Sequence, residues 1–225
     1  MTVQKQVLLV VTSFKRIDEE HSTGLWLEEF AVPYLALSAA GYGITVASPQ
    51  GGMAPVDAES TKETMPVEWQ ATSGVLKNTR RLGDLDYQEY AAVILPGGHG
   101  PLFDLAKDKQ MAQLLRLFAR ERKLIGAVCH GPAALVSATL ADGRPLVAGR
   151  QVTAFSNEEE QMTHLSSVVP FLLESKLKEL GARFVKKQPW MTHVVIDGNL
   201  VTGQNRQSSG QFSEVIVNML AGQGG

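Results

Sequence analysis

The 225-residue chain has little cysteine, little net charge and no long apolar run. Its single cysteine, Cys129, excludes an internal disulfide and a cysteine-rich structural metal site. The formal net charge is −2, from 21 basic and 23 acidic side chains. A charge balance of this kind gives no electrostatic footprint for nucleic acid or for an anionic membrane. We therefore expect a cytoplasmic protein whose partners are small molecules or proteins.

The apolar stretches are also too short for a membrane span or for the core of a secretory signal. Near the N-terminus only five apolar residues follow one another, at 7–11. The long uncharged stretch at 30–56 is broken by prolines and glycines. We interpret the first stretch as a strand and the second as a helix followed by a buried strand.

Short β-rich runs alternate with segments of helical period along the chain. The runs expected to be strands are 7–13, 43–48, 91–98, 123–129, 151–155 and 193–203. The segments expected to be helices are 24–40, 75–85, 110–121, 132–140, 168–180 and 207–221. Most of the runs lack polar alternation, which is typical of strands buried on both faces. The pattern predicts a flavodoxin-like α/β three-layer sandwich, a mostly parallel sheet with helices on both faces, in a single domain over 1–225.

In such a fold, ligands bind beyond the carboxyl ends of the strands, and Cys129 stands at one of these ends. The sequence A-V-C-H-G at 127–131 places small residues two positions either side of the cysteine, as in a nucleophile elbow. Pro132 suits the first turn of a helix, whose positive end would favour a thiolate. By residue type alone an unpaired cysteine is more often a small buried hydrophobe. The spacing, the proline and the strand end together favour a nucleophile.

A second strand end is V-I-L-P-G-G-H-G-P at 93–101. Glycines there can present bare backbone N–H groups to a ligand. An oxyanion hole needs two such donors, and the N–H groups of Gly98 and His130 are our candidates. A plain glycine turn is the equally weighted alternative.

The third stretch is T-G-L-W-L-E-E-F-A-V-P-Y at 23–34. Glu28 and Glu29 lie early in a helix among apolar neighbours, so one carboxyl can turn towards the protein. Burial raises the pKa of a carboxyl and suits it to general acid and base catalysis. The alternative is a solvated helix face with favourable charge at its N-terminus.

Together these stretches resemble a known family. The segments G-L-W-L-E-E, I-L-P-G-G-H-G, G-A-V-C-H-G-P-A-A-L, A-F-S-N-E-E-E and V-T-G-Q-N occur in the order seen in the PfpI-like superfamily, also called type 1 glutamine amidotransferase-like. Within it, the chain is similar to the branch of heat-shock-type chaperones and glutathione-independent glyoxalases, known as glyoxalase III. The resemblance covers nearly the whole chain.

The resemblance implies roles for particular residues. Cys129 is the nucleophile, His130 its adjacent histidine, and Glu29 the carboxyl that hydrogen-bonds the sulfur. Glu29 is chosen over Glu28 because it stands four residues before Pro33, as the family's acid does. The acid that orients the histidine comes from the segment F-S-N-E-E-E, where Glu158 is our choice over Asn157 and Glu159.

The resemblance also implies the chemistry. Methylglyoxal or a related 2-oxoaldehyde is converted to a 2-hydroxy acid, as in a D-lactate dehydratase, with no metal or organic cofactor. The alternatives are a cysteine-dependent hydrolase or amidase, peptidase-like or deglycase-like, and a stress chaperone that binds unfolding proteins. A glutaminase is disfavoured because the late segments contain no histidine after His193. The family further implies a homodimer.

Four side chains around this centre carry narrower expectations. Adjacent residues of a helix do not face each other, so we expect Glu29, rather than His130, to be the direct partner of Cys129. His99 and Trp26 are expected to line the substrate pocket. Arg206 stands where the G-Q-N turn of the family is commonly followed by proline, a change expected to alter the loop without touching the chemistry. For His21, His164 and His193 we expect structural or surface positions.

Overall fold

A seven-stranded sheet forms the centre of the computed structural model, which describes residues 4–222. Its order is β3-β2-β1-β4-β5-β9-β8. Every neighbouring pair is parallel except β8 and β9, which run antiparallel. The strands are β1 (Gln6–Val10), β2 (Gly43–Ser48), β3 (Arg80–Arg81), β4 (Tyr90–Leu95), β5 (Leu124–Val128), β8 (Val194–Asp197) and β9 (Leu200–Gly203). The expected mostly parallel sheet is confirmed.

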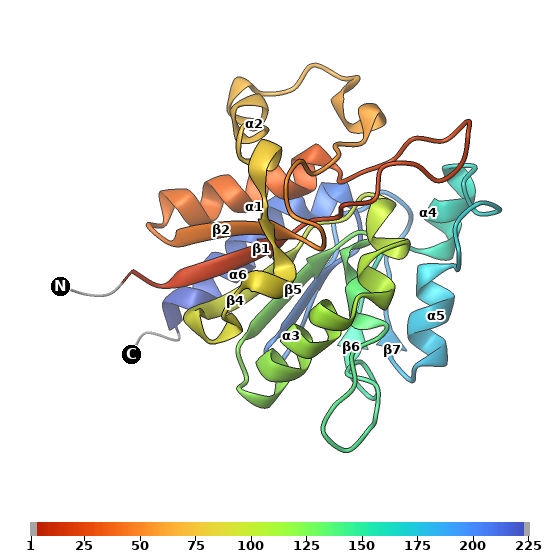
Figure 1. Cartoon of the computed structure of the whole chain (residues 1–225). Coiled ribbons are helices and arrows are strands. Elements are labelled where there is room, and N and C mark those ends of the chain that lie inside the picture. Colours follow the sequence, from red (N-terminus) through yellow and green to blue (C-terminus); the bar gives the residue numbers. More distant parts are fainter. Residues whose placement is uncertain (1–3, 223–225) are drawn as a thin grey trace.

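Helices cover both faces of this sheet, which completes the predicted three layers (Figure 1). On one face lie α1 (Leu27–Ala39) and α6 (Ser209–Gly222), which pack against each other, with α2 (Val67–Thr72) against α1. On the other face lie α3 (Lys109–Arg120) and α5 (Leu173–Glu179), whose buried residues share one core cluster. The remaining elements are α4 (Asn157–Met162) and the two-stranded sheet of β6 (Gln151–Val152) and β7 (Arg183–Phe184). Within residues 4–222, no helix has the length and hydropathy that crossing a bilayer requires.

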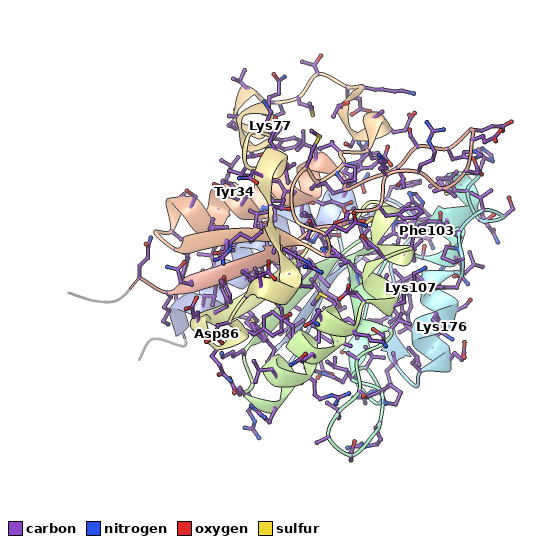
Figure 2. The ribbon with its side chains drawn as sticks, viewed as in Figure 1. Tyr34, Lys77, Asp86, Phe103, Lys107 and Lys176 are labelled. Carbon is purple, nitrogen blue, oxygen red and sulfur yellow. The ribbon has the colours of Figure 1, made fainter. Side chains whose placement is uncertain are left out.

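Alternate residues of each central strand supply the two cores. On β1, Leu8 and Val10 face the α3 side, whereas Val7 and Leu9 face the side of α1 and α6, and all four are fully buried. A strand covered on both faces needs apolar residues at every position, which explains the missing polar alternation. In Figure 2, side chains fill the layers on both sides of the ribbon, and the labelled Tyr34 and Phe103 pack against opposite cores.

Several predicted helices are shorter or absent. The segment expected as a helix at 75–85 is two 3₁₀ turns flanking β3, and the one at 132–140 is only a five-residue 3₁₀ helix, Gly131–Leu135. The run at 193–203 is a hairpin, because Gly198 and Asn199 form a two-residue turn between β8 and β9 in which Gly198 has φ 57°. Two short helices, α2 and α4, were not predicted, although Ser156 and Glu159 form a capping box at the start of α4.

The connection after β5 is the tightest part of the fold. Cys129 follows β5 with φ 60°, a left-handed conformation that is uncommon for a side chain other than glycine. Two residues later, a Cβ on Gly131 would collide with the carbonyl oxygen of Leu95 at the end of β4. The elbow therefore requires glycine at position 131, as the A-V-C-H-G spacing predicts.

Gly131→Ala should destabilise the protein, because its methyl group meets backbone that cannot move aside. We expect a loss of about 3 kcal/mol or more in the free energy of unfolding, measured by urea denaturation. Gly210→Ala is the matched control, since it lies in α6 with open space around its Cβ. That substitution should be neutral or stabilising by about 0.4 to 1 kcal/mol. A Gly131→Ala protein as stable as the wild type would contradict the tight elbow.

Candidate active site

A cavity of about 460 Å³ opens at the carboxyl ends of β4 and β5. Six of the seven residues predicted for the site line it: Trp26, Glu29, Gly98, His99, Cys129 and His130. A larger hollow of about 610 Å³ lies elsewhere, between residues 83–88 and α3, and contains none of these residues. Six of the seven predicted site residues thus lie together in one cavity.

Cys129 lies at the floor of this cavity and is 5% exposed. Gly98 and Glu29 line the cavity beside it, and both affect the pKa of its thiol. Burial, followed by the charge of Glu29, raises the pKa of the Cys129 thiol well above its ordinary value. The predicted helix dipole does not lower this pKa, because the helix after the cysteine is only a short 3₁₀ turn.

Glu29 comes from the first turn of α1 and is 1% exposed. One of its carboxyl oxygens accepts a hydrogen bond of 3.0 Å from the Gly97 N–H. A Cβ on Gly97 would lie 2.6 Å from that oxygen, so only glycine permits the approach. Burial raises the pKa of Glu29 to about 8, which places both protonation states within reach near neutral pH. Glu28, the alternative, is less enclosed.

His130 is paired with an acid that the sequence analysis did not choose. Its Nε2 lies 2.7 Å from a carboxylate oxygen of Glu160, and Nε2 of His99 lies 2.8 Å from the other oxygen. Burial opposes ionisation of Glu160, but the two histidines hold its pKa well below the ordinary range. Burial also lowers the pKa of His130, so the ring is neutral near pH 7. With its single proton on Nε2, His130 presents Nδ1 as an acceptor.

The structure therefore contradicts the prediction that Glu158 is the acid that orients His130. Its carboxylate points to the surface and pairs with Lys186 at 3.1 Å, away from His130. The alternatives fail too, since Asn157 hydrogen-bonds Ser175 and Glu159 is engaged in the capping box with Ser156. Successive residues of a helix point in different directions, so only one of the three glutamates faces the histidine. The capping box engages Glu159 with Ser156, which leaves the next residue, Glu160, as the glutamate that pairs with His130.

The expectation that Glu29, rather than His130, is the direct partner of Cys129 is also corrected. Nδ1 of His130 lies 3.4 Å from the Cys129 sulfur. The expectation assumed a helix at this point, but Cys129 has φ 60° and lies outside any helix. The left-handed elbow turns the two adjacent side chains towards each other.

His99, His130 and Glu160 are the group within residues 4–222 that could hold a metal ion. Their ligand atoms lie within 4.8 Å of one another, and all three residues are buried. The same atoms already satisfy one another in hydrogen bonds. His21, His164 and His193 lie outside the cavity, His21 in a surface pair with Asp18.

These features define an α/β protein with a cysteine at a nucleophile elbow, a histidine–glutamate pair and a buried carboxyl beside the sulfur. The profile of the DJ-1/PfpI family matches residues 23–219, and the chain belongs to that family.

The chain is also similar to individual proteins in sequence and in structure. The glutathione-independent glyoxalase hsp3101 of Schizosaccharomyces pombe is 29% identical over 96% of this chain and 96% of its own. The crystal structure of glyoxalase III from Candida albicans has a TM-score of 0.88 at 26% identity, covering 95% of this chain and 96% of that one. A crystal structure named APC35852 has a TM-score of 0.95 at 47% identity, covering 98% of this chain and 100% of that one.

Glu29→Gln should stabilise the protein more at pH 9 than at pH 5. The pKa of Glu29 is about 8 in the folded protein against 4.5 as its ordinary value, so folding stability is lost as the pH rises between these values. A shift of this size corresponds to roughly 3 to 5 kcal/mol. The measurement is urea unfolding of both proteins at the two pH values.

The control for this experiment is Glu158→Gln, which removes an exposed carboxylate. Its difference from the wild type should be nearly the same at pH 5 and pH 9. An equally pH-independent difference for Glu29→Gln would contradict a buried carboxyl with a raised pKa.

Proposed function

We propose that this protein is a glutathione-independent glyoxalase that converts methylglyoxal or related 2-oxoaldehydes to 2-hydroxy acids. The observation that carries the proposal is that one cavity holds both the buried Glu29 carboxyl, with its pKa near 8, and the Cys129 thiol, whose sulfur lies 3.4 Å from Nδ1 of His130. Moving a proton between two neighbouring carbons requires an acid and base with a pKa close to the working pH. The resemblance of the chain to proteins named as glyoxalases supports the same reaction.

The first step is capture of the aldehyde. Nδ1 of His130 accepts the thiol proton across 3.4 Å, and the sulfur of Cys129 forms a bond to the aldehyde carbon. The resulting oxyanion takes up a proton from His130 and becomes the hydroxyl of a hemithioacetal. The N–H groups of Gly98 and His130 hold this oxygen while it is negatively charged. Glu160 keeps the His130 ring in the orientation and tautomer that this step needs.

The second step moves hydrogen from the aldehyde carbon to the ketone carbon. Glu29 in its carboxylate form removes the proton of the first carbon and returns it to the second, while the hydroxyl proton passes to the ketone oxygen. The first carbon is oxidised and the second is reduced by the same electron pair, so no external oxidant or reductant is needed. The product is a thioester of the 2-hydroxy acid on Cys129.

The third step is hydrolysis. Water attacks the thioester carbonyl, the carbon–sulfur bond breaks, and the proton released by water returns to the sulfur. The 2-hydroxy acid leaves and the thiol is restored. A thiol that must be free in every cycle is compatible with the reducing cytoplasm. The homodimer, the hydrolase alternative and the binding of unfolding proteins stay predictions.

Cys129→Ala should abolish formation of lactate from methylglyoxal in the absence of glutathione. Loss of the nucleophile removes the covalent intermediate on which both later steps depend. The measurement is an enzymatic lactate assay on purified protein, with folding checked by circular dichroism. Lactate formation at the wild-type rate by the folded variant would refute the mechanism.

Glu160→Gln should lower kcat by about 100-fold or more, since the amide no longer fixes the tautomer of His130. Glu158→Gln is the matched control, with the same change two residues earlier in α4. It should stay within about threefold of the wild type, because its side chain faces the surface. Equal losses in the two variants would contradict the assignment of Glu160.

A further inference from the structure

Arg206 forms part of the cavity wall beside the start of α1. It opens the short 3₁₀ turn Arg206–Ser208 after β9, and its guanidinium lies 5.7 Å from the ring centre of Trp26. Trp26 and Arg206 both border the same hollow as Cys129. The sequence analysis expected an altered loop at this position and did not predict that Arg206 borders the cavity.

The donors of Arg206 are largely unused. Its nearest carboxylate oxygen belongs to Glu63, at 3.7 Å, and the Glu63 side chain is 79% exposed. Such a loose surface pair contributes little free energy. Across the described part of the chain, the guanidinium forms no hydrogen bond to a protein atom. The planar fork of N–H groups is therefore open to a ligand.

The backbone beneath Arg206 is firmly held. The side-chain amide of Asn205 donates to a carboxylate oxygen of Glu159 at 2.7 Å and to the Met191 carbonyl at 3.0 Å. Ser208 donates to the Asn205 amide oxygen at 2.9 Å. Asn205 is fully buried, so the turn that carries Arg206 starts from a fixed point. A recognition group on a fixed turn loses less conformational freedom on binding.

The other cation of the cavity wall is Lys62, which forms an ion pair of 2.5 Å with Glu59. Arg206 has only the looser pair of 3.7 Å with Glu63. Its positive charge also lowers the pKa of Glu28 and Glu29 against the larger effect of burial. Arg206 is thus the cation of the cavity wall whose donors are open.

We propose that Arg206 binds a carboxylate of the substrate, so that the preferred substrates are 2-oxoaldehydes with a carboxylate at the far end. This inference rests on the proposed function, which places the aldehyde end at Cys129. Guanidinium and carboxylate match in two parallel hydrogen bonds, a geometry that a neutral substrate such as methylglyoxal does not provide. The cavity of about 460 Å³ has room for a substrate larger than methylglyoxal.

The test compares three substrates: γ,δ-dioxovalerate, its methyl ester and methylglyoxal. The acid and the ester share the reacting carbons and differ in the charge at the far end. Wild-type kcat/KM should be at least about tenfold higher for the acid than for the ester, as expected for a charged hydrogen-bonded contact. Arg206→Gln should remove this preference by raising KM for the acid about tenfold, while kcat/KM for the ester and for methylglyoxal change by the same factor as each other.

Two further variants sharpen the comparison. Arg206→Lys keeps the charge but loses the fork, and should recover only part of the preference. Arg144→Gln removes one positive charge from an exposed position outside the cavity, where Arg144 pairs with Asp142. It should keep the full preference for the acid. Loss of the preference in Arg144→Gln would overturn the assignment, since net charge alone would then explain it.

A competing role for Arg206 gives a different outcome. If the residue served only to adjust the pKa of Glu29, Arg206→Gln would change kcat and its pH profile equally for all three substrates, which would overturn the inference. Equal wild-type kcat/KM for acid and ester would also overturn it, while steady turnover of methylglyoxal would leave the proposed function standing. Failure of the wild type to convert any of the three would refute the proposed function itself.

Discussion

The buried carboxyl of Glu29 holds three separate parts of the chain together at the site. It belongs to the first turn of α1, accepts the Gly97 N–H from the loop after β4, and lines the same cavity as Cys129, which follows β5. The Trp26 N–H donates to the Gly97 carbonyl at 3.2 Å. Both the N–H and the carbonyl of Gly97 are therefore hydrogen-bonded to residues at the start of α1. The glycines at 97 and 131 and the left-handed turn at Cys129 all permit this close convergence. The burial of Glu29 at this convergence raises the pKa on which the proposed proton transfer depends.

Three glutamates at or next to the cavity lie in different environments and make different contacts. Within residues 4–222 Glu29 forms no ion pair, and burial raises its pKa to about 8. Glu160 lies between two histidines, which hold its pKa low and fix the ring of His130. Glu159 accepts hydrogen bonds from Ser156 and Asn205, and so joins α4 to the turn that carries Arg206. In the proposed mechanism these carboxyls divide into an acid–base group, a positioning group and a structural group.

The sequence predicted the sheet, the elbow and most of the cavity, because each leaves a local pattern. Buried strands leave apolar runs, and the elbow leaves small residues around Cys129. It did not predict the contact of His130 with Cys129, since that contact depends on the left-handed turn and not on helical spacing. Among the acids at 158–160, the choice depends on how α4 is rotated against the sheet, which spacing alone does not determine. The position of Arg206 depends on a buried network that joins segments far apart in the chain.

The central claim is that Glu29 moves the proton after Cys129 has captured the aldehyde. The most direct measurement treats Glu29→Gln with methylglyoxal, follows alkylation of Cys129 by iodoacetamide, and assays lactate in the same sample. We expect methylglyoxal to protect the cysteine from alkylation, because capture needs only the thiol and His130, while lactate forms about 100-fold or more slowly than with the wild type. Lactate formation at the wild-type rate by Glu29→Gln would contradict the claim.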